Sequence, residues 1–266
     1  MLSKQKIKLV SSLKIKKFRD ELGLFVAEGE KNVIDLAHKF SCKMVFATQK
    51  WLQNNRNFHF FKDVEQQIFE VKNTEELKPV SFLKTPQEVV AVFQIPDNQQ
   101  IDIKKVQNEL SLALDCVQNA GNLGTIIRIA DWFGIPNIFC SLDTADIYNP
   151  KVVQAAMGAL ANVNVHYVDL QRFIKEAKEN KIEIFGTFLN GKNIYQQNLP
   201  KNGIIVLGNE GNGISTEIEN LIEKKLLIPN FSLKNQTSES LNVAVAASIV
   251  CSEFRRNYEL VFSALR

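Results

Sequence analysis

In residues 204–213, Ile-Ile-Val-Leu-Gly-Asn-Glu-Gly-Asn-Gly, a short apolar run is followed by a segment with three glycines and one carboxylate. An apolar run of this length without polar alternation predicts a buried strand of a parallel sheet. In open α/β sheets, ligands bind just beyond the carboxyl ends of such strands. The stretch by itself is also compatible with a plain turn that leaves the Glu210 carboxylate in solvent.

A second polar motif, residues 119–128 (Asn-Ala-Gly-Asn-Leu-Gly-Thr-Ile-Ile-Arg), follows another apolar run and opens a helical pattern. We expect Asn122 to cap this helix, and the glycines permit close approach of a ligand to the backbone. Arg128 follows Asn122 by less than two helical turns, so its side chain can point back toward the same cleft. Taken alone, the motif fits either simple capping or a phosphate site, although its spacing is not G-x-G-x-x-G.

A third motif consists of Leu227-Ile228-Pro229 and, after a polar loop, residues 239–244 (Glu-Ser-Leu-Asn-Val-Ala). The last helical pattern runs from Leu241 to about Arg255 and is rich in small residues, which allow close packing against a neighbour. Ser240 is expected to cap this helix.

Short β-type runs alternate with helical patterns along the chain, as is typical of α/β proteins. A proline followed by polar residues at 95–100 predicts a linker, so we expect two domains, residues 1–98 and 108–266. The expected elements are strands at 24–27, 43–47 and 88–94 with a helix at 29–38, then strands at 112–117, 137–140, 163–168, 182–188 and 204–207.

Length and composition limit the class of protein. The 266 residues suffice for two modest domains, and 45% hydrophobic with 23% charged residues is ordinary for a globular chain rather than a disordered one. No apolar run approaches the about 18 residues of a membrane span, and the basic start lacks the apolar core of a secretory signal. The four cysteines form no CxxC pair. We therefore expect a cytoplasmic protein with reduced thiols and no membrane contact.

The net charge of +3 says little, but its distribution is uneven. Residues 1–20 carry six lysines and Arg19 against one acid, Asp20. Clustered cations favour a polyanionic partner, because they can replace the counterions of a phosphate backbone. A solvated amphipathic helix explains the same pattern, and the two interpretations stay open.

Together the three motifs resemble those of the SpoU (TrmH-like) family of RNA 2′-O-ribose methyltransferases, in the SPOUT superfamily. The resemblance covers residues 108–258 and lies in Asn119-x-x-Asn122-Leu123-Gly124-x-x-x-Arg128, Leu207-Gly208-Asn209-Glu210-Gly211-x-Gly213, and Ile228-Pro229 followed by Ser240-Leu241-Asn242-Val243. Residues 19–29 also resemble the start of the family's N-terminal RNA-substrate-binding domain, whose fold is similar to ribosomal protein L30e. In this chain the loop at 230–239 is longer than the family's usual link and lacks its glycine.

The resemblance implies an α/β fold, with a parallel SPOUT sheet that ends in a C-terminal trefoil knot and a small L30e-like α/β domain in front of it. It implies an enzyme that transfers the methyl group of S-adenosylmethionine to a ribose 2′-hydroxyl of RNA, with rRNA favoured over tRNA. A homodimer through the knot domain is also expected. The implied cofactor contacts are main-chain groups near Thr187, Leu207, Gly208, Ile228 and Leu241.

The resemblance also implies five catalytic residues and no metal. Arg128 is expected to be essential for activating the ribose hydroxyl, either as a base or as an electrostatic clamp, since a free guanidinium stays protonated. Asn122 and Glu210 are expected to orient Arg128 or the substrate. Ser240 and Asn242 are expected to hold the ribose or a phosphate and to close the cofactor site.

The alternative is a catalytically inactive RNA-binding dimer of the same fold, and the presence of all five candidate catalytic residues argues against it. A nucleotide-dependent oxidoreductase would need a G-x-G-x-x-G loop and an acidic residue about 20 positions later, and the chain has neither arrangement. A relative that methylates a base instead of a ribose stays open.

Overall fold

The structure is a computed structural model that describes residues 2–54, 67–97, 100–232 and 240–256. Its internal contacts divide the chain into two compact units, each with its own sheet. The first unit contains Met1–Asn98, Leu123–Arg128 and Asp146–Asn162, and the second contains Gln99–Asn122, Ile129–Ala145 and Val163–Arg266. Among the described residues, none of the helices is both long enough and apolar enough to cross a membrane.

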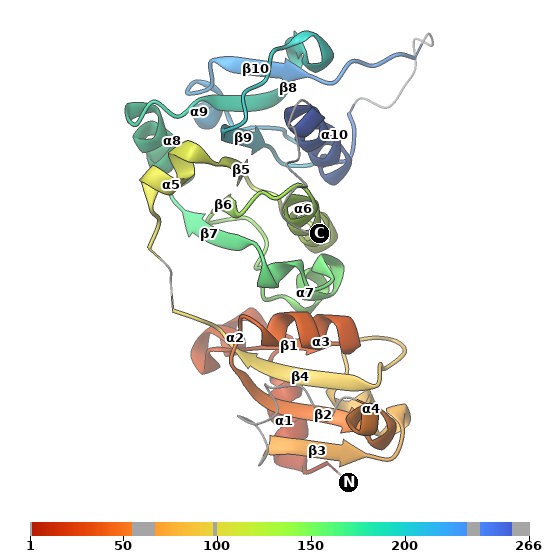
Figure 1. The fold of residues 1–266 in the computed structure, drawn as a ribbon. Coiled ribbons are helices and arrows are strands. Elements are labelled where there is room, and N and C mark those ends of the chain that lie inside the picture. Colours follow the sequence, from red (N-terminus) through yellow and green to blue (C-terminus); the bar gives the residue numbers. More distant parts are fainter. Residues whose placement is uncertain (1, 55–66, 98–99, 233–239, 257–266) are drawn as a thin grey trace, which may run out of the picture. The chain divides into compact units, whose positions relative to one another are not determined.

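The first unit is built on a four-stranded sheet in the order β1-β4-β2-β3 (Figure 1). Strand β4 is antiparallel to β1 and to β2, while β2 and β3 are parallel. The three expected strands are confirmed, and β3 was not predicted because its four residues are too few to stand out from a loop. The strands are β1 (Leu24–Glu28), β2 (Cys42–Thr48), β3 (Ile68–Val71) and β4 (Val89–Gln94).

Helices cover this sheet and bury one apolar cluster against it. Val10 and Leu13 from the N-terminal segment pack with Val26, Phe46 and Val92 of the sheet, and Figure 1 shows α1 against the strands. The helical elements of the unit are α1 (Lys4–Ser12), α2 (Lys16–Leu22), α3 (Glu30–Ala37), α4 (Gln49–Asn54), η3 (Thr74–Val80), α7 (Pro150–Ala156) and η4 (Ala159–Ala161).

Arg19 does not belong to the exposed basic segment in which the sequence placed it. Its side chain is only 2% exposed, pairs with the Asp146 carboxylate at 2.5 Å and donates to the Leu13 carbonyl at 2.8 Å. A buried guanidinium that is already neutralised is not available to a phosphate backbone, so the expectation is wrong for this residue. The exposed cations of the segment include Lys4, Lys8 and Lys14.

The second unit is a six-stranded, wholly parallel sheet in the order β10-β8-β9-β5-β6-β7. Strand β5 ends at Leu114 instead of the expected Val117, because Cys116 has a left-handed φ of 59° that a strand cannot continue. Strand β10 was not predicted, since half of it is lysine. The strands are β5 (Leu110–Leu114), β6 (Asn137–Ser141), β7 (Asn164–Val168), β8 (Ile184–Asn193), β9 (Gly203–Leu207) and β10 (Lys224–Leu227).

Both faces of the parallel sheet are covered. On one face, α5 (Ile103–Asn108), α8 (Leu170–Glu179) and α9 (Thr216–Glu219) contribute to a cluster with the sheet residues Ala113 and Val206. On the other face, α10 (Val243–Arg256) places Phe254 edge-on to Phe185, with ring centroids 5.0 Å apart. Helix α6 (Ala120–Trp132) follows β5, and η5 (Ile194–Gln196) follows β8.

The strand order brings the first two motifs together. Strands β5 and β9 are neighbours in parallel register, with Leu114 opposite Leu207. From β5 the sheet continues through β6 and β7 on one side, and through β9, β8 and β10 on the other. The carboxyl ends of β5 and β9 therefore mark the switch point at which open α/β sheets bind ligands.

Candidate functional site

The loop after β9 is a tight turn that only glycine permits at its first position. The backbone N–H of Asn209 donates to the Gly213 carbonyl at 2.8 Å, and the Gly213 N–H donates back at 3.0 Å. A Cβ on Gly208 would lie 2.2 Å from the Gly213 carbonyl carbon, and Gly213 has a φ of 71°. The motif is thus a turn whose backbone is pulled close together, as glycine allows.

Two residues without a predicted role, Asn209 and Asp115, fasten this turn to the end of β5. The Asn209 side chain accepts from the N–H groups of Gly211 and Asn212 and donates to the Cys116 carbonyl at 2.8 Å. Asp115, which is buried, accepts from the Ser215 N–H at 2.7 Å. The only signal in the sequence was their position directly beyond apolar strands.

A hydrogen-bonded network joins one residue from each of the three motifs. Glu210 Oε1 accepts from Asn122 Nδ2 at 3.0 Å and from the Asn119 backbone N–H at 3.2 Å. Asn122 Oδ1 accepts from Asn242 Nδ2 at 3.0 Å. The fold therefore brings together three of the five expected catalytic side chains, Asn122, Glu210 and Asn242.

The two helix caps differ from the expected ones. Asn119, not Asn122, caps α6, since its Oδ1 accepts from the N–H groups of Gly121 and Asn122 at 2.9 and 3.1 Å. Asn242, not Ser240, accepts from the first N–H groups of α10, those of Ala244 and Val245. Asn and Ser are equally good caps, so composition alone does not fix where a helix begins. The shift leaves the Asn122 side chain available to Glu210.

The network keeps Glu210 ionised. Burial by itself raises the pKa of Glu210, but hydrogen bonds from Asn122 and from the backbone amides of Glu210, Asn119 and Gln118 together outweigh it. The net effect lowers the pKa below the ordinary value for glutamate. A fixed negative charge therefore stands at the switch point across the neutral pH range.

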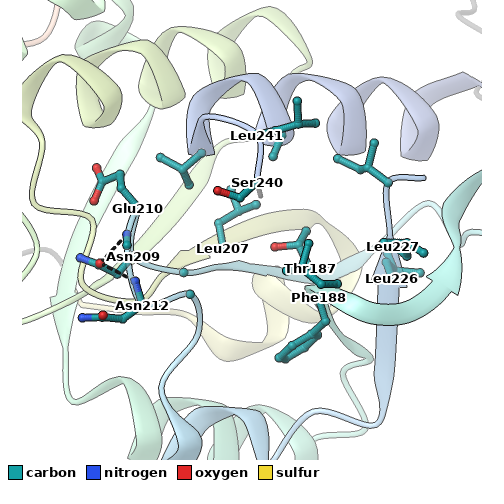
Figure 2. A pocket seen from close by; sticks show the side chains of 17 residues that line it. Thr187, Phe188, Leu207, Asn209, Glu210, Asn212, Leu226, Leu227, Ser240 and Leu241 are labelled. Atoms are coloured by element: carbon teal, nitrogen blue, oxygen red, sulfur yellow. Dashed lines mark hydrogen bonds between the residues drawn. The ribbon is translucent and has the colours of Figure 1, made fainter. Parts of the chain in front are cut away.

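Beside this charge lies a pocket of about 290 Å³. Figure 2 shows Asn209, Glu210 and Asn212 at one end and Leu226 and Leu227 at the other. All five expected cofactor-binding residues line the pocket, and so do two of the expected catalytic residues: Thr187, Leu207, Gly208, Ile228 and Leu241, with Glu210 and Ser240. Residues 233–239 of the long loop lie outside the described residues.

Among the five expected catalytic residues, Arg128 alone neither joins the network nor lines the pocket. It is exposed on α6, six residues beyond Asn122. On an ideal helix that spacing is about 9 Å along the axis and about 120° around it, so the two side chains leave the helix in different directions. Within the described part of the chain, no residue gives Arg128 a hydrogen bond or an ion pair. Its catalytic role stays a prediction.

A parallel sheet with an apolar pocket, an open glycine turn and a fixed carboxylate at its switch point defines an α/β enzyme that binds a small organic cofactor there. The chain belongs to the SpoU rRNA methylase family, whose model matches residues 109–252. Residues 4–91 match the MRM3-like substrate binding domain.

Relatives along the whole chain agree with this assignment. The chain is 30% identical over 254 residues to the 23S rRNA (guanosine(2553)-2′-O)-methyltransferase RlmP of Bacillus subtilis, covering 94% of this chain and 96% of that protein. A TrmH-family protein from Porphyromonas gingivalis is 38% identical, with a TM-score of 0.85 over 96% of this chain and 99% of the other. The AdoMet-bound rRNA methyltransferase from Sinorhizobium meliloti is 26% identical, with a TM-score of 0.81 over 97% of both chains.

As a member of this family, the chain is an S-adenosylmethionine-dependent RNA methyltransferase that acts on the ribose 2′-hydroxyl. The family, the α/β fold with its parallel sheet, the enzymatic class and the cofactor predicted from the three motifs are therefore confirmed.

Proposed function

We propose that this enzyme methylates a ribose in ribosomal RNA, with residues 1–98 holding the RNA and residues 108–266 carrying out the transfer. The observation that carries the proposal is the network of Asn122, Glu210 and Asn242 beside the pocket. The Bacillus subtilis relative is named for a guanosine of 23S rRNA. That name favours large-subunit rRNA over tRNA as the substrate.

The pocket suits the cofactor. S-adenosylmethionine supplies a methyl group on a positively charged sulfur. Apolar side chains such as Leu207 and Leu226 can enclose an adenine ring, and the glycine turn at residues 208–213 lines the same pocket. The ionised Glu210 lines the same pocket and offers a compensating charge. We assign the cofactor contacts to Thr187, Leu207, Gly208, Ile228 and Leu241.

The side chains of the network then hold the nucleotide for in-line attack. Bound S-adenosylmethionine would supply the methyl carbon: the ribose oxygen would bond to it, the carbon–sulfur electron pair would stay on the sulfur as a neutral thioether, and the hydroxyl proton would pass to solvent water. Asn122, Ser240 and Asn242 hold the ribose or its phosphate against the pocket. The cationic guanidinium of Arg128 stabilises the negative charge that develops on the ribose oxygen.

We further propose that the C-terminal part of the catalytic domain forms a trefoil knot and pairs with a second copy. Trp132 is 86% exposed, and Leu241 and Val245 are each 50% exposed. Large apolar side chains at the surface of α6 and near the start of α10 support an interface there. We also propose a cytoplasmic location, with which a ribosomal substrate is compatible.

The test combines cofactor binding with a choice of substrates. Calorimetry with S-adenosylmethionine measures binding, and labelled cofactor is then offered with unmodified 23S rRNA, 16S rRNA or tRNA transcripts. We expect label in 23S rRNA, and a loss of at least about 100-fold in Arg128→Ala with cofactor binding kept within about twofold. Label confined to tRNA would contradict the proposal that ribosomal RNA is the substrate. RNA binding with no transfer to any RNA would favour the inactive RNA-binding dimer.

A further inference from the structure

We propose that Asn209 is a positioning residue for methyl transfer: its side chain ties the glycine turn after β9 to the end of β5 and so fixes both the pocket and Glu210. This inference rests on the proposed function. The Asn209 amide uses its oxygen and its nitrogen within the protein, so it acts through its neighbours although its residue borders the pocket.

Asn209 shapes its own turn. Its Oδ1 accepts from the Gly211 N–H at 2.9 Å and from the Asn212 N–H at 3.0 Å, as the dashed lines of Figure 2 show. These two bonds fold the chain back so that the backbone of Gly213 reaches the backbone of Asn209. The two bonds thereby hold residues 208–213, which line the pocket, in one fixed arrangement.

A hydrogen bond from the Asn209 side chain also ties the turn to the backbone just after β5. Asn209 Nδ2 donates to the carbonyl of Cys116, a residue 93 positions earlier. That carbonyl is itself held, because Cys116 has a left-handed φ of 59° and its N–H donates to Ser141 Oγ at 2.8 Å. The Ser141 hydroxyl in turn donates to the Asp143 carboxylate. The tie therefore ends on a part of the backbone that β6 keeps in place.

The adjacent residues Asn209 and Glu210 form hydrogen bonds to the two ends of the segment at residues 116–119. Asn209 binds the Cys116 carbonyl, and the next residue, Glu210, accepts from the N–H of Asn119. Because both attachments fall within residues 116–119, releasing the first lets Glu210 move relative to Asn119 and Asn122. Small displacements of oriented groups reduce transfer rates strongly.

Two variants separate the turn from the tie. Asn209→Asp keeps an oxygen for Gly211 and Asn212 but sets a carboxylate oxygen against the Cys116 carbonyl, whereas Asn209→Ala removes all three bonds. We expect kcat to fall at least about tenfold in both. The KM and Kd for S-adenosylmethionine should rise at least about tenfold in Asn209→Ala and less in Asn209→Asp, which keeps the turn.

Asn202→Asp is the matched control. Asn202 is exposed at the amino end of β9, and its side chain likewise donates to a backbone carbonyl, that of Gln107 at 2.7 Å. The same chemical change is made there far along the strand from the pocket, so kcat and KM should stay within about twofold of the unchanged protein. A lower kcat in Asn202→Asp equal to that of Asn209→Asp would overturn the proposal.

Readouts that do not depend on RNA keep this inference separable from the proposed function. In Asn209→Ala, NMR titration of Glu210 should show a raised pKa, because its donors Asn119 and Asn122 are displaced. If no RNA is methylated, the proposed function fails, but cofactor Kd and this titration still decide on Asn209. An Asn209→Asp protein with unchanged kcat and KM, or a variant that loses only melting temperature, would overturn the positioning role.

Discussion

Glu210 shows at the scale of a single residue how the network prepares a charge. Partial burial by itself raises the pKa of a carboxylate. Asn122 and three backbone amides donate hydrogen bonds to Glu210, and together they lower its pKa. A folded-state pKa below the unfolded value stabilises the fold above the unfolded pKa. That contribution is lost as the pH falls through the folded pKa.

Asn122→Ala tests this charge. The substitution removes a donor to the carboxylate, so we expect the pKa of Glu210 to rise and its charge to be lost at a higher pH. The pH at which acidification weakens cofactor binding, the acid limb of the binding curve, should then rise by several tenths of a unit to about one unit. Calorimetric titration with S-adenosylmethionine from pH 4 to pH 8 measures the shift. An unchanged acid limb would show that Asn122 does not support the Glu210 carboxylate.

Cys116 offers a second test among single residues. A hydrogen bond to the Asp143 carboxylate, helped by burial and by nearby acids, raises the pKa of the Cys116 thiol to about 11. Only the thiolate reacts with iodoacetamide, so the native thiol should be slow at pH 8. In Asp143→Asn we expect alkylation of Cys116 to become at least several-fold faster, and mass spectrometry measures this rate.

The buried thiols of Cys42, Cys140 and Cys251 are internal controls for that experiment, because they are free but enclosed. They should stay unmodified in both proteins while the fold is intact. Equal alkylation rates of Cys116 in the two proteins would remove Asp143 as the cause of the raised pKa.

Sequence and structure agree on which residues gather at the site more than on what each one does. Glu210 and Asn122 were chosen from their motifs, and the fold places them in contact. The capping roles went to the neighbours Asn119 and Asn242, because several good caps stood within a few residues of each helix start. Asn209 had no visible role, since its partner at Cys116 depends on how two distant strands align.

At the scale of elements, the turn after β9 depends on one position that tolerates no side chain. In Gly208→Ala the new Cβ would lie 2.2 Å from the Gly213 carbonyl carbon and 2.3 Å from the Ile214 nitrogen. Both are backbone atoms that cannot rotate away. We expect a loss of about 1–3 kcal/mol in unfolding free energy and at least about tenfold in cofactor affinity.

Gly211→Ala is the control for that substitution. Among the described residues, its Cβ would meet only Asn209 Oδ1, at an ordinary 3.6 Å, in the same turn. Denaturant unfolding should therefore place Gly211→Ala close to the unchanged protein and Gly208→Ala well below it. Equal unfolding free energies for the two variants would show that the turn does not require glycine at position 208.

The elements themselves were largely predictable, because strands buried on both faces read as continuous apolar runs. Strands β6, β7 and β9 lie within about a residue of their expected bounds. Strand β10 was missed because an edge strand can carry polar residues such as Lys224 and Lys225. The predicted end of β5 is three residues too late, since no sequence signal indicates the left-handed backbone conformation of Cys116.

For the whole molecule, the proposed dimer makes a direct prediction. Sedimentation equilibrium should give twice the chain mass of 30.2 kDa at micromolar concentration. Val245→Asp places a charge on an exposed apolar position of α10 and should shift the protein to the monomer without unfolding it. A monomeric unchanged protein at these concentrations would contradict the dimer.

Family and function could be read from three short motifs, whereas properties of the assembled chain could not. Periodicity describes local segments, and a knot or a dimer depends on how distant segments thread and associate. The RNA target cannot be predicted from local patterns either, since RNA is recognised largely by shape and unpaired bases. The basic segment around Lys4 and Lys8 shows only that a polyanion would be tolerated there.

The most direct test of the central claim is the identity of the methylated nucleoside. The enzyme is incubated with labelled S-adenosylmethionine and unmodified 23S rRNA, the RNA is digested, and the labelled nucleoside is identified by chromatography, with Arg128→Ala alongside. We predict label on a single 2′-O-methyl nucleoside, and its disappearance in the variant. Label on a base, in either protein, would contradict transfer to the ribose hydroxyl.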